Sequence, residues 1–331
     1  DKKEMKKVVV LAIPRTIGLS AQQIALFTLI VFASSMVTGS VAVLQLSFNL
    51  QSVPLSIIGV SYSVAAFPTL ARLYSSRETK KFIDQVLTAV RHIIFWSIPV
   101  TALFIVLRAQ IVRVILGSGE FSWSDTRLTA AALALFALSV VAQSLVLLLV
   151  RGFYAAGKTM IPVFANVFCA GLIVVSAFVL NNHLFPVPFF RDFIEALLRV
   201  EGIAGTSVLS LPLAYSIGMT LNVFILWFLF KRHFKIGRCE KIHKSFRHSL
   251  YSAVIMGFVS YNLLEVFDNV FDINTFWGIF LQGAFSGMGG IIAGVTLLFV
   301  IKNDEIREIS KAVRHKFWKT KPIIPDKIDL T

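Results

Sequence analysis

Polar side chains recur inside the apolar stretch from Pro14 to Leu73, and they are the residues most able to bind a polar ligand. In the first half of the stretch, Arg15 and Gln22 are seven residues apart and share one face of a helix. In the second half, steps of three and four residues again place the polar residues on one face. Lipid cannot satisfy such groups, so within a bilayer they must face protein or water. The residues of this second face are Gln45, Asn49, Ser52, Ser56, Gly59 and Ser63.

Side chains of these types can bind a ligand that carries both a negative charge and hydroxyl groups. A guanidinium at Arg15 attracts an anionic headgroup in a water-filled cavity; the alternative is that it reaches back to the interface and binds lipid phosphate nonspecifically. Asn49, Ser52 and Ser56 can hydrogen-bond a sugar or peptide headgroup; the alternative is hydrogen bonding between helices, worth about 0.6 kcal/mol per contact. We therefore predict a substrate-binding face made of Arg15, Gln22, Asn49, Ser52 and Ser56.

Sequence patterns typical of an enzyme are absent. The interiors of the predicted spans contain no Asp or Glu, and the sequence has no HExxH, CxxC or glycine-rich phosphate loop. Acid–base and metal chemistry have no visible residues here. We predict no catalytic residue and no metal ligand, and we expect that the chain is not an enzyme.

The elements that position these residues are apolar helices. With 56% hydrophobic and 15% charged residues and a mean hydropathy of +0.77, the chain is typical of a polytopic helical membrane protein. We predict an all-α membrane bundle of eight spans, the first two at 8–35 and 39–70. Residues 189–200 predict an amphipathic surface helix between spans five and six. The predicted segments are a cytoplasmic lead-in (1–7), a six-span lobe (8–231), a basic loop (232–248), two further transmembrane helices (249–301) and a basic tail (302–331).

The placement of charge predicts the orientation of the chain. Most of the 32 Lys and Arg residues fall in connections on the same side as both chain ends, so we predict that both ends are cytoplasmic. The net charge of +14 then reflects attraction to anionic lipid, and we predict no binding of nucleic acid. Arg91 and Arg151 are expected to anchor the cytoplasmic interface. The arginines on the opposite side are Arg108, Arg113, Arg127, Arg191 and Arg199.

A series of short motifs, in order along residues 8–231, resembles the MurJ (MviN) family of lipid II flippases. The most specific motif is RGFYAAGKT at 151–159, followed by Pro162. The others are GSV at 39–41, VPLSIIGV at 53–60, AFPTL at 66–70, IPVT at 98–101, GSGEF at 117–121 and GIAGT at 202–206.

The resemblance implies a 14-helix transporter of the multidrug/oligosaccharidyl-lipid/polysaccharide exporter superfamily. This chain would supply helices seven to fourteen, which are the second lobe and two extra helices that form a groove for a lipid tail. The implied function is movement of a lipid-linked peptidoglycan precursor from the inner to the outer leaflet of the bacterial plasma membrane by alternating access. The expected partners are this lipid-linked oligosaccharide, membrane lipids and an N-terminal lobe missing from the chain.

Two positions depart from the family pattern. The family typically places an Arg where Asn49 stands, and often an Asp linked to cation binding where Leu29 stands. We therefore expect Arg15 to replace the lost positive charge, and Asn166 is a candidate cation ligand, with packing polarity as its alternative. No cofactor is predicted, and coupling to a monovalent cation is left open. The alternative functions are export of another polysaccharide-lipid or a drug within the superfamily, and a membrane-embedded transferase or scaffold.

Overall fold

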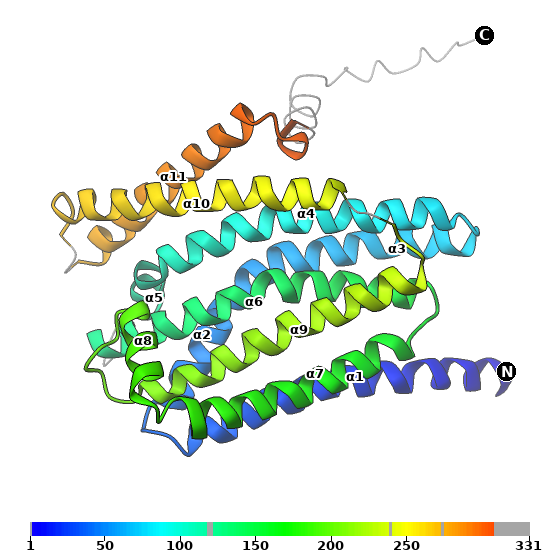
Figure 1. The fold of residues 1–331 in the computed structure, drawn as a ribbon, viewed down its shortest axis with the longest axis horizontal. Helices are drawn as coiled ribbons and strands as arrows, with labels where there is room; N and C mark the ends of the chain where they lie inside the picture. The colour runs from blue at the N-terminus through cyan, green and yellow to red at the C-terminus, as the bar shows by residue number, and fades with distance from the viewer. Residues whose placement is uncertain (1, 118–121, 238–239, 273–274, 308–331) are drawn as a thin grey trace, which may run out of the picture.

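The computed structural model describes residues 2–117, 122–237, 240–272 and 275–307, and for residues 2–15, 17 and 19 it describes the backbone only. Throughout this part the chain is helical, without strands, and the long helices lie side by side (Figure 1). The predicted all-α bundle is therefore confirmed. The long helices are α1 (Lys2–Ser34), α2 (Ser40–Pro54), α3 (Ser61–Ser75), α4 (Thr79–Val106), α6 (Trp123–Ala155), α7 (Met160–Val179), α9 (Ser210–His233), α10 (Glu240–Asp268) and α11 (Phe276–Val300).

Shorter elements connect or interrupt these helices. A π-helical turn, η1 (Leu55–Val60), joins α2 to α3 within one continuous span, and a second, η2 (Leu180–Leu184), extends α7. The helices α5 (Arg108–Leu116) and α8 (Pro188–Leu198) lie at one end of the bundle, and η3 (Thr206–Leu209) leads into α9. Helix α8 is the predicted amphipathic helix: Ile194 and Leu198 are buried, whereas Phe189, Phe193 and Leu197 are exposed.

Helix α6 is the central element of the bundle. It begins at a capping box in which the side chains of Ser122 and Asp125 each accept a hydrogen bond from the other's backbone N–H. The carboxylate of Asp125 also interacts favourably with the positive end of the helix dipole. Its body is almost uniformly apolar, and it packs against α2, α3, α4, α5 and α9. A helix buried on most of its surface is expected to be hydrophobic all round, as this one is.

Helices α10 and α11 form a pair that packs against α4 and α5 at one side of the bundle (Figure 1). Gly290 and Gly294 let the pair approach closely, because a Cβ at either would meet α10 atoms nearer than 3.0 Å. The end of the pair is tied down by an ion pair between Arg91 Nε on α4 and Glu305 Oε1 at 3.2 Å. The carboxylate of Glu305 therefore binds Arg91, and the expected anchoring of Arg91 at the cytoplasmic interface stays a prediction.

Seven spans are long and apolar enough to cross a membrane within the described residues. They begin with α2–η1–α3 and end with α11; α1 contributes a shorter apolar stretch, Ser20–Ser34. The first predicted span, 8–35, and with it the total of eight, therefore stays a prediction. Most of the predicted basic tail, from residue 308 onward, lies outside the described residues.

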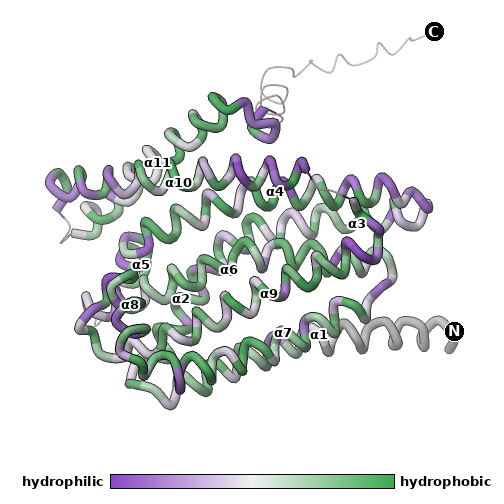
Figure 2. Tube along the Cα trace, in the orientation of Figure 1, coloured by the Kyte–Doolittle hydropathy of each residue, from purple (hydrophilic) through white to green (hydrophobic). Residues whose placement is uncertain are grey.

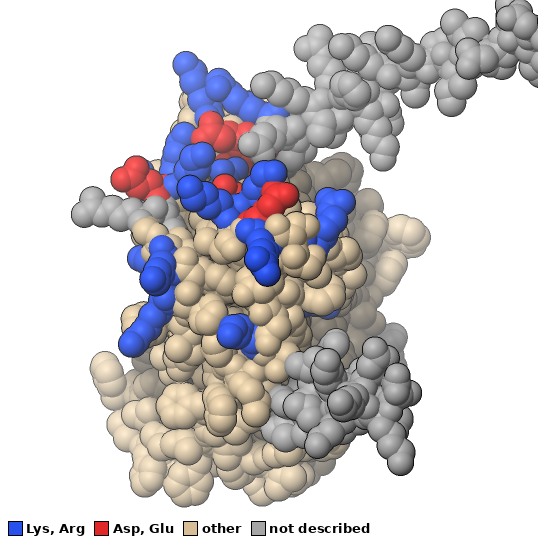
Figure 3. All heavy atoms as spheres, turned by 90° about the vertical axis from the view of Figure 1, so that its right-hand side faces the viewer, with Lys and Arg blue, Asp and Glu red and all other residues tan. Residues whose placement is uncertain are grey.

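Hydrophobic residues fill the middle of the helices, and hydrophilic residues gather toward their ends (Figure 2). The end that carries the N-terminus of α1, the α3–α4 turn and the start of α10 is rich in Lys and Arg (Figure 3). The opposite end carries α5 and α8.

Candidate functional site

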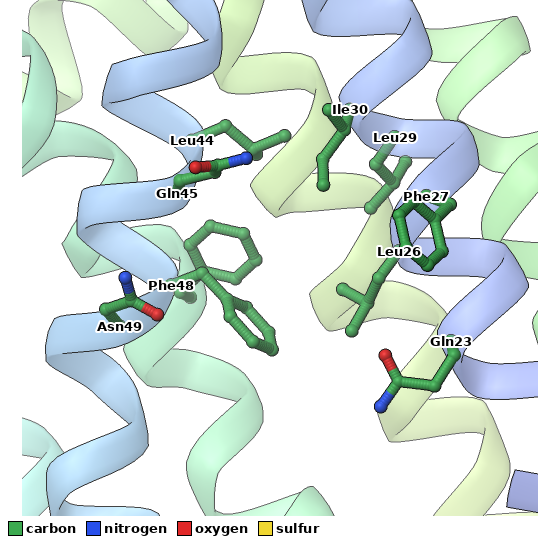
Figure 4. Close-up of a pocket in the computed structure, with 10 residues that line it drawn as sticks. Gln23, Leu26, Phe27, Leu29, Ile30, Leu44, Gln45, Phe48 and Asn49 are labelled. Atoms are coloured by element: carbon green, nitrogen blue, oxygen red, sulfur yellow. The ribbon is translucent and has the colours of Figure 1, made fainter.

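A cleft of about 230 Å³ opens between α1 and α2. Figure 4 shows Gln23 on α1 across this space from Phe48 and Asn49 on α2, with Gln45 further along α2, opposite Ile30. We call this space the α1–α2 cleft. Its walls are mostly apolar, and amide groups supply its polar atoms. The lining residues are Gln23, Leu26, Phe27, Leu29, Ile30, Leu44, Gln45, Phe48, Asn49 and Phe136.

An aromatic cluster forms the floor of the cleft. The ring of Phe48 on α2 lies edge-on to Phe136 on α6, at 5.5 Å between centroids, and to Tyr215 on α9, at 5.7 Å. Such edge-to-face pairs contribute about 0.5–1.5 kcal/mol each beyond simple burial. The cluster fixes α2 against the centre of the bundle while leaving the α1 side of the cleft open.

A buried polar network lies between the same three helices. The Nε2 of Gln143 on α6 donates to Gln51 Oε1 on α2 at 3.1 Å and to Ser139 Oγ at 2.7 Å. The hydroxyl of Tyr215 donates to Gln143 Oε1 at 3.2 Å. Because every one of these side chains is buried, the network specifies how α2, α6 and α9 fit together rather than contacting a ligand. Gln51 and Gln143 are not among the predicted site residues, although two glutamines in apolar spans were a visible signal.

The π-helical turn corrects the predicted polar face beyond Leu55. One extra residue in a turn rotates the following helix by about 100°. Gly59 therefore packs on Ser144 of α6, and Ser63 is buried, instead of sharing the face of Asn49. The Nη1 of Arg151 donates to Ser63 Oγ at 2.8 Å and to the carbonyl of Val60 at 3.4 Å. The guanidinium of Arg151 therefore joins α6 to α3 and the π turn, and its expected anchoring of the interface stays a prediction.

The predicted substrate residues occupy different positions. Asn49 is exposed and lines the cleft, and its backbone carbonyl accepts a hydrogen bond from the Ser52 hydroxyl at 2.6 Å. Ser56 is exposed on η1, just beyond the cleft. Gln22 is half-buried and lies outside the cleft lining, where its neighbour Gln23 stands instead. Arg15 lies in α1, and its side chain is outside the described part of the chain.

The candidate cation region is uncharged in the described structure. Leu29 is 1% exposed, and Asn166 on α7 is buried and accepts a hydrogen bond from Asn222 Nδ2 on α9 at 3.1 Å. The described residues contain no group of three or more His, Cys, Asp or Glu side chains placed to hold a metal ion. Asn166 is thus engaged in a contact between helices, and its role toward a cation stays a prediction.

Other helices of the bundle form two further grooves with mostly apolar walls. One, of about 380 Å³, runs between η1 and α4 and is lined by Pro54, Ile57, Trp96 and their neighbours. The other, of about 640 Å³, lies between α10 and helices α4, α6 and α9. The first groove continues from Asn49 along the same helix. The second groove is lined by Leu138 and Leu145 of α6, whereas the α1–α2 cleft is lined by Phe136 of the same helix, so the two have different walls.

Comparison with known proteins gives consistent results. A family model described as lipid II flippase MurJ matches residues 1–281. A probable lipid II flippase MurJ from Rickettsia prowazekii is 32% identical over 165 residues, which are 50% of this chain and 32% of that protein. The Haemophilus influenzae protein of the same description is 28% identical over 223 residues, 66% of this chain and 39% of that protein. The chain thus spans about a third of the length of these relatives.

Solved structures share the fold. A lipid II flippase MurJ in an inward closed conformation superposes with a TM-score of 0.64 at 19% identity, covering 94% of this chain and 56% of that one. An outward-facing multidrug resistance transporter of the MATE family superposes with a TM-score of 0.54 at 16% identity, covering 93% of this chain and 68% of that one. At these identities the superpositions establish the helical arrangement.

Proposed function

The chain belongs to the lipid II flippase MurJ family, and from that membership we propose that it moves a lipid-linked peptidoglycan precursor, lipid II, from the inner to the outer leaflet of the bacterial plasma membrane by alternating access. The family is one of transporters rather than catalysts. Because the chain spans about a third of its curated relatives' length, we propose that an N-terminal lobe faces it and completes the transport cavity.

The observation that carries this proposal is the presence of amide groups in an open cleft at bilayer depth. Asn49 stands nine residues after Ser40, where its span begins, which is about 14 Å along the helix axis. This distance is close to half of the ~30 Å hydrocarbon layer. An exposed amide at that depth needs a polar partner, and a hydrated sugar–peptide headgroup crossing the membrane provides one.

The residues then take separate roles. Arg15 draws in the pyrophosphate from the cytoplasmic end of α1, and Asn49, Ser52, Ser56 and Gln22 contact the polar headgroup. The position of Gln23 and Gln45 in the cleft supports adding their amides to this set. The apolar groove beside Trp96 continues from Asn49 along the helix and suits the hydrocarbon tail, which stays in an apolar environment while the headgroup moves.

Orientation follows from the asymmetry of charge. Lys and Arg gather at the end of the bundle that carries the start of α1 (Figure 3), which supports a cytoplasmic location for that end. Since α1 starts at that end and α11 ends toward it, both ends of the chain are then cytoplasmic. Coupling to a monovalent cation through Asn166 is left open, because Leu29 is uncharged and Asn166 already accepts a hydrogen bond from Asn222.

A second candidate is export of another lipid-linked polysaccharide or a drug. The fold that the chain shares with the multidrug resistance transporter supports this second candidate. Binding measurements with labelled lipid II separate the two: competition by its soluble headgroup supports the flippase, and competition by drugs alone supports the exporter.

The test of the proposed function is complementation of a strain depleted of its own flippase by the full-length protein. Arg15→Ala and Asn49→Ala are expected to lower complementation and transport of labelled lipid II. The control is Thr28→Val, because the Thr28 hydroxyl bonds the carbonyl of Ile24 in its own helix, at 2.9 Å. Full complementation by both alanine variants would show that these residues do not bind substrate.

A further inference from the structure

Three arginines that lie far apart in the sequence meet at the end of the bundle opposite the lysine-rich end. Arg108 starts α5, Arg127 lies in the first turns of α6, and Arg199 follows α8. Arg108 Nη2 donates to the carbonyl of Leu198 at 3.2 Å, and Arg127 Nε donates to the carbonyl of Arg199 at 3.1 Å. The guanidinium of Arg199 donates to the Tyr261 hydroxyl of α10 at 2.8 Å. We call Arg108, Arg127 and Arg199 the arginine cluster.

The cluster is not neutralised by carboxylates. Within the described residues, no Asp or Glu oxygen lies within 4.0 Å of any of its three guanidinium groups. Of the acidic residues nearest the cluster in the sequence, Asp125 caps α6, and Glu195 accepts the Thr206 hydroxyl and pairs with Arg191. Among the described ion pairs, neither Glu201 nor Glu265 is bound to a member of the cluster. Uncompensated like charges held together cost free energy unless an anion offsets them.

Two members of the cluster act on each other. Burial and the nearby charge of Arg199 lower the pKa of Arg108. A guanidinium has five N–H donors, and the hydrogen bonds described here use two in Arg108, two in Arg127 and one in Arg199. The backbone carbonyls of Leu198 and Arg199, at the negative end of the α8 dipole, hold the guanidinium groups of Arg108 and Arg127 in place. Most N–H donors of the three guanidinium groups remain unused by these hydrogen bonds.

Exposed aromatic side chains around the arginine cluster mark the level of the lipid headgroups. Trp123, one turn before Arg127, is 57% exposed, and Trp277 at the same end of α11 is 67% exposed. Exposed tryptophans mark the interface between hydrocarbon and headgroups. The exposed Phe189 and Phe193 of α8 extend this apolar rim. Arginine forks at this level match the geometry of phosphate oxygens.

We infer that the arginine cluster is a binding site for the phosphate group of a lipid in the far leaflet. This inference does not depend on transport, because the site lies at the bundle end and not in the α1–α2 cleft. The site holds a lipid headgroup between the lobe and the α10–α11 pair. The far leaflet is the one at the bundle end opposite the lysine-rich end. A lipid bound at the arginine cluster there would contact the groups that join the end of α8 to α10, namely Arg199 and Tyr261.

The test is photo-crosslinking of the full-length protein in neutral detergent. The probe is a phosphatidylglycerol analogue with a photoreactive headgroup, and labelled peptides are mapped by mass spectrometry. Labelling is expected in the peptides around Arg199 and Tyr261. Arg199→Gln, which keeps the backbone carbonyl that Arg127 binds, is expected to weaken labelling about tenfold, the effect of losing one charge-assisted hydrogen bond or more.

The matched control is Arg191→Gln on the same helix, because Arg191 already pairs with Asp192 at 3.4 Å and Glu195 at 3.9 Å. Its labelling should stay within about twofold of the unmodified protein. Competition by inorganic pyrophosphate would show that the phosphate group alone is recognised; lack of competition with labelling intact would show that the whole lipid is needed. The inference is wrong if Arg199→Gln labels like the unmodified protein, or if Arg191→Gln loses as much.

Discussion

The close approach between the π-helical turn and the central helix gives a sharp prediction for Gly59→Ala. A Cβ at Gly59 would lie 2.7 Å from Ser144 Oγ and 2.8 Å from Ser144 Cα. The hydroxyl could rotate away, but the Cα belongs to the backbone of α6, so η1 itself must move. Overpacking of this kind costs about 1–3 kcal/mol. We expect Gly59→Ala to lower the stability of the protein by that amount.

Gly171→Ala is the matched control, since it makes the same chemical change in helix α7. No atom lies within 4 Å of a Cβ placed at Gly171. Alanine is favoured over glycine in a helix interior by about 1 kcal/mol, so this variant should be neutral or more stable. The double variant Gly59→Ala/Ser144→Gly should recover only part of the loss, because the new methyl group still meets the backbone of α6.

The assay is thermal unfolding of the full-length protein in detergent, followed by intrinsic fluorescence. The apparent melting temperature of Gly59→Ala should fall by several degrees relative to Gly171→Ala. If Gly59→Ala melts at or above the temperature of Gly171→Ala, the packing of η1 against α6 described here is wrong. Full recovery in the double variant would show that the side chain of Ser144, and not its backbone, sets the limit.

Two further predictions concern the network and the end of the α10–α11 pair. Gln143→Leu should destabilise the protein by about 1–3 kcal/mol in the same melting assay, because Gln51 and Tyr215 lose a buried partner; an unchanged melting temperature would mean that the network is not formed. The Lys244 hydrogen bond holds the pKa of Asp304 below its ordinary value of 3.8, so this contact stabilises the folded state at neutral pH and is lost as the pH falls through the lowered pKa. Asp304→Asn should therefore melt slightly below the unmodified protein at neutral pH, and the difference should disappear in acid; a difference that does not change with pH would mean that the contact is absent.

The sequence predicted the helical bundle and part of the cleft for physical reasons that also explain its failures. Gln45 and Asn49 lie where a regular helix places them, because α2 is regular up to Pro54. The same periodicity failed at Gly59 and Ser63, since local composition does not reveal that the chain inserts an extra residue into the turn after Pro54.

Contacts between residues far apart in the chain could not be predicted from the sequence, for a different reason. Gln51 and Gln143 are 92 positions apart, and neither carries a signal that names the other. Arg91 and Arg151 stand at span ends, where interfacial anchoring is the ordinary role. Their partners, Glu305 and Ser63, are set by how the helices pack.

The most direct test of the central claim is the water accessibility of Asn49. In the full-length protein with Cys169→Ala and Cys239→Ser, single cysteines are placed at Asn49 and, as a control, at Ile292, which is 67% exposed in the middle of α11. A charged, membrane-impermeant thiol reagent should label Asn49→Cys, because the α1–α2 cleft admits water, and should leave Ile292→Cys unlabelled, because that side chain faces lipid. Failure of the reagent to reach Asn49→Cys from either side of the membrane in any transport state would contradict the account.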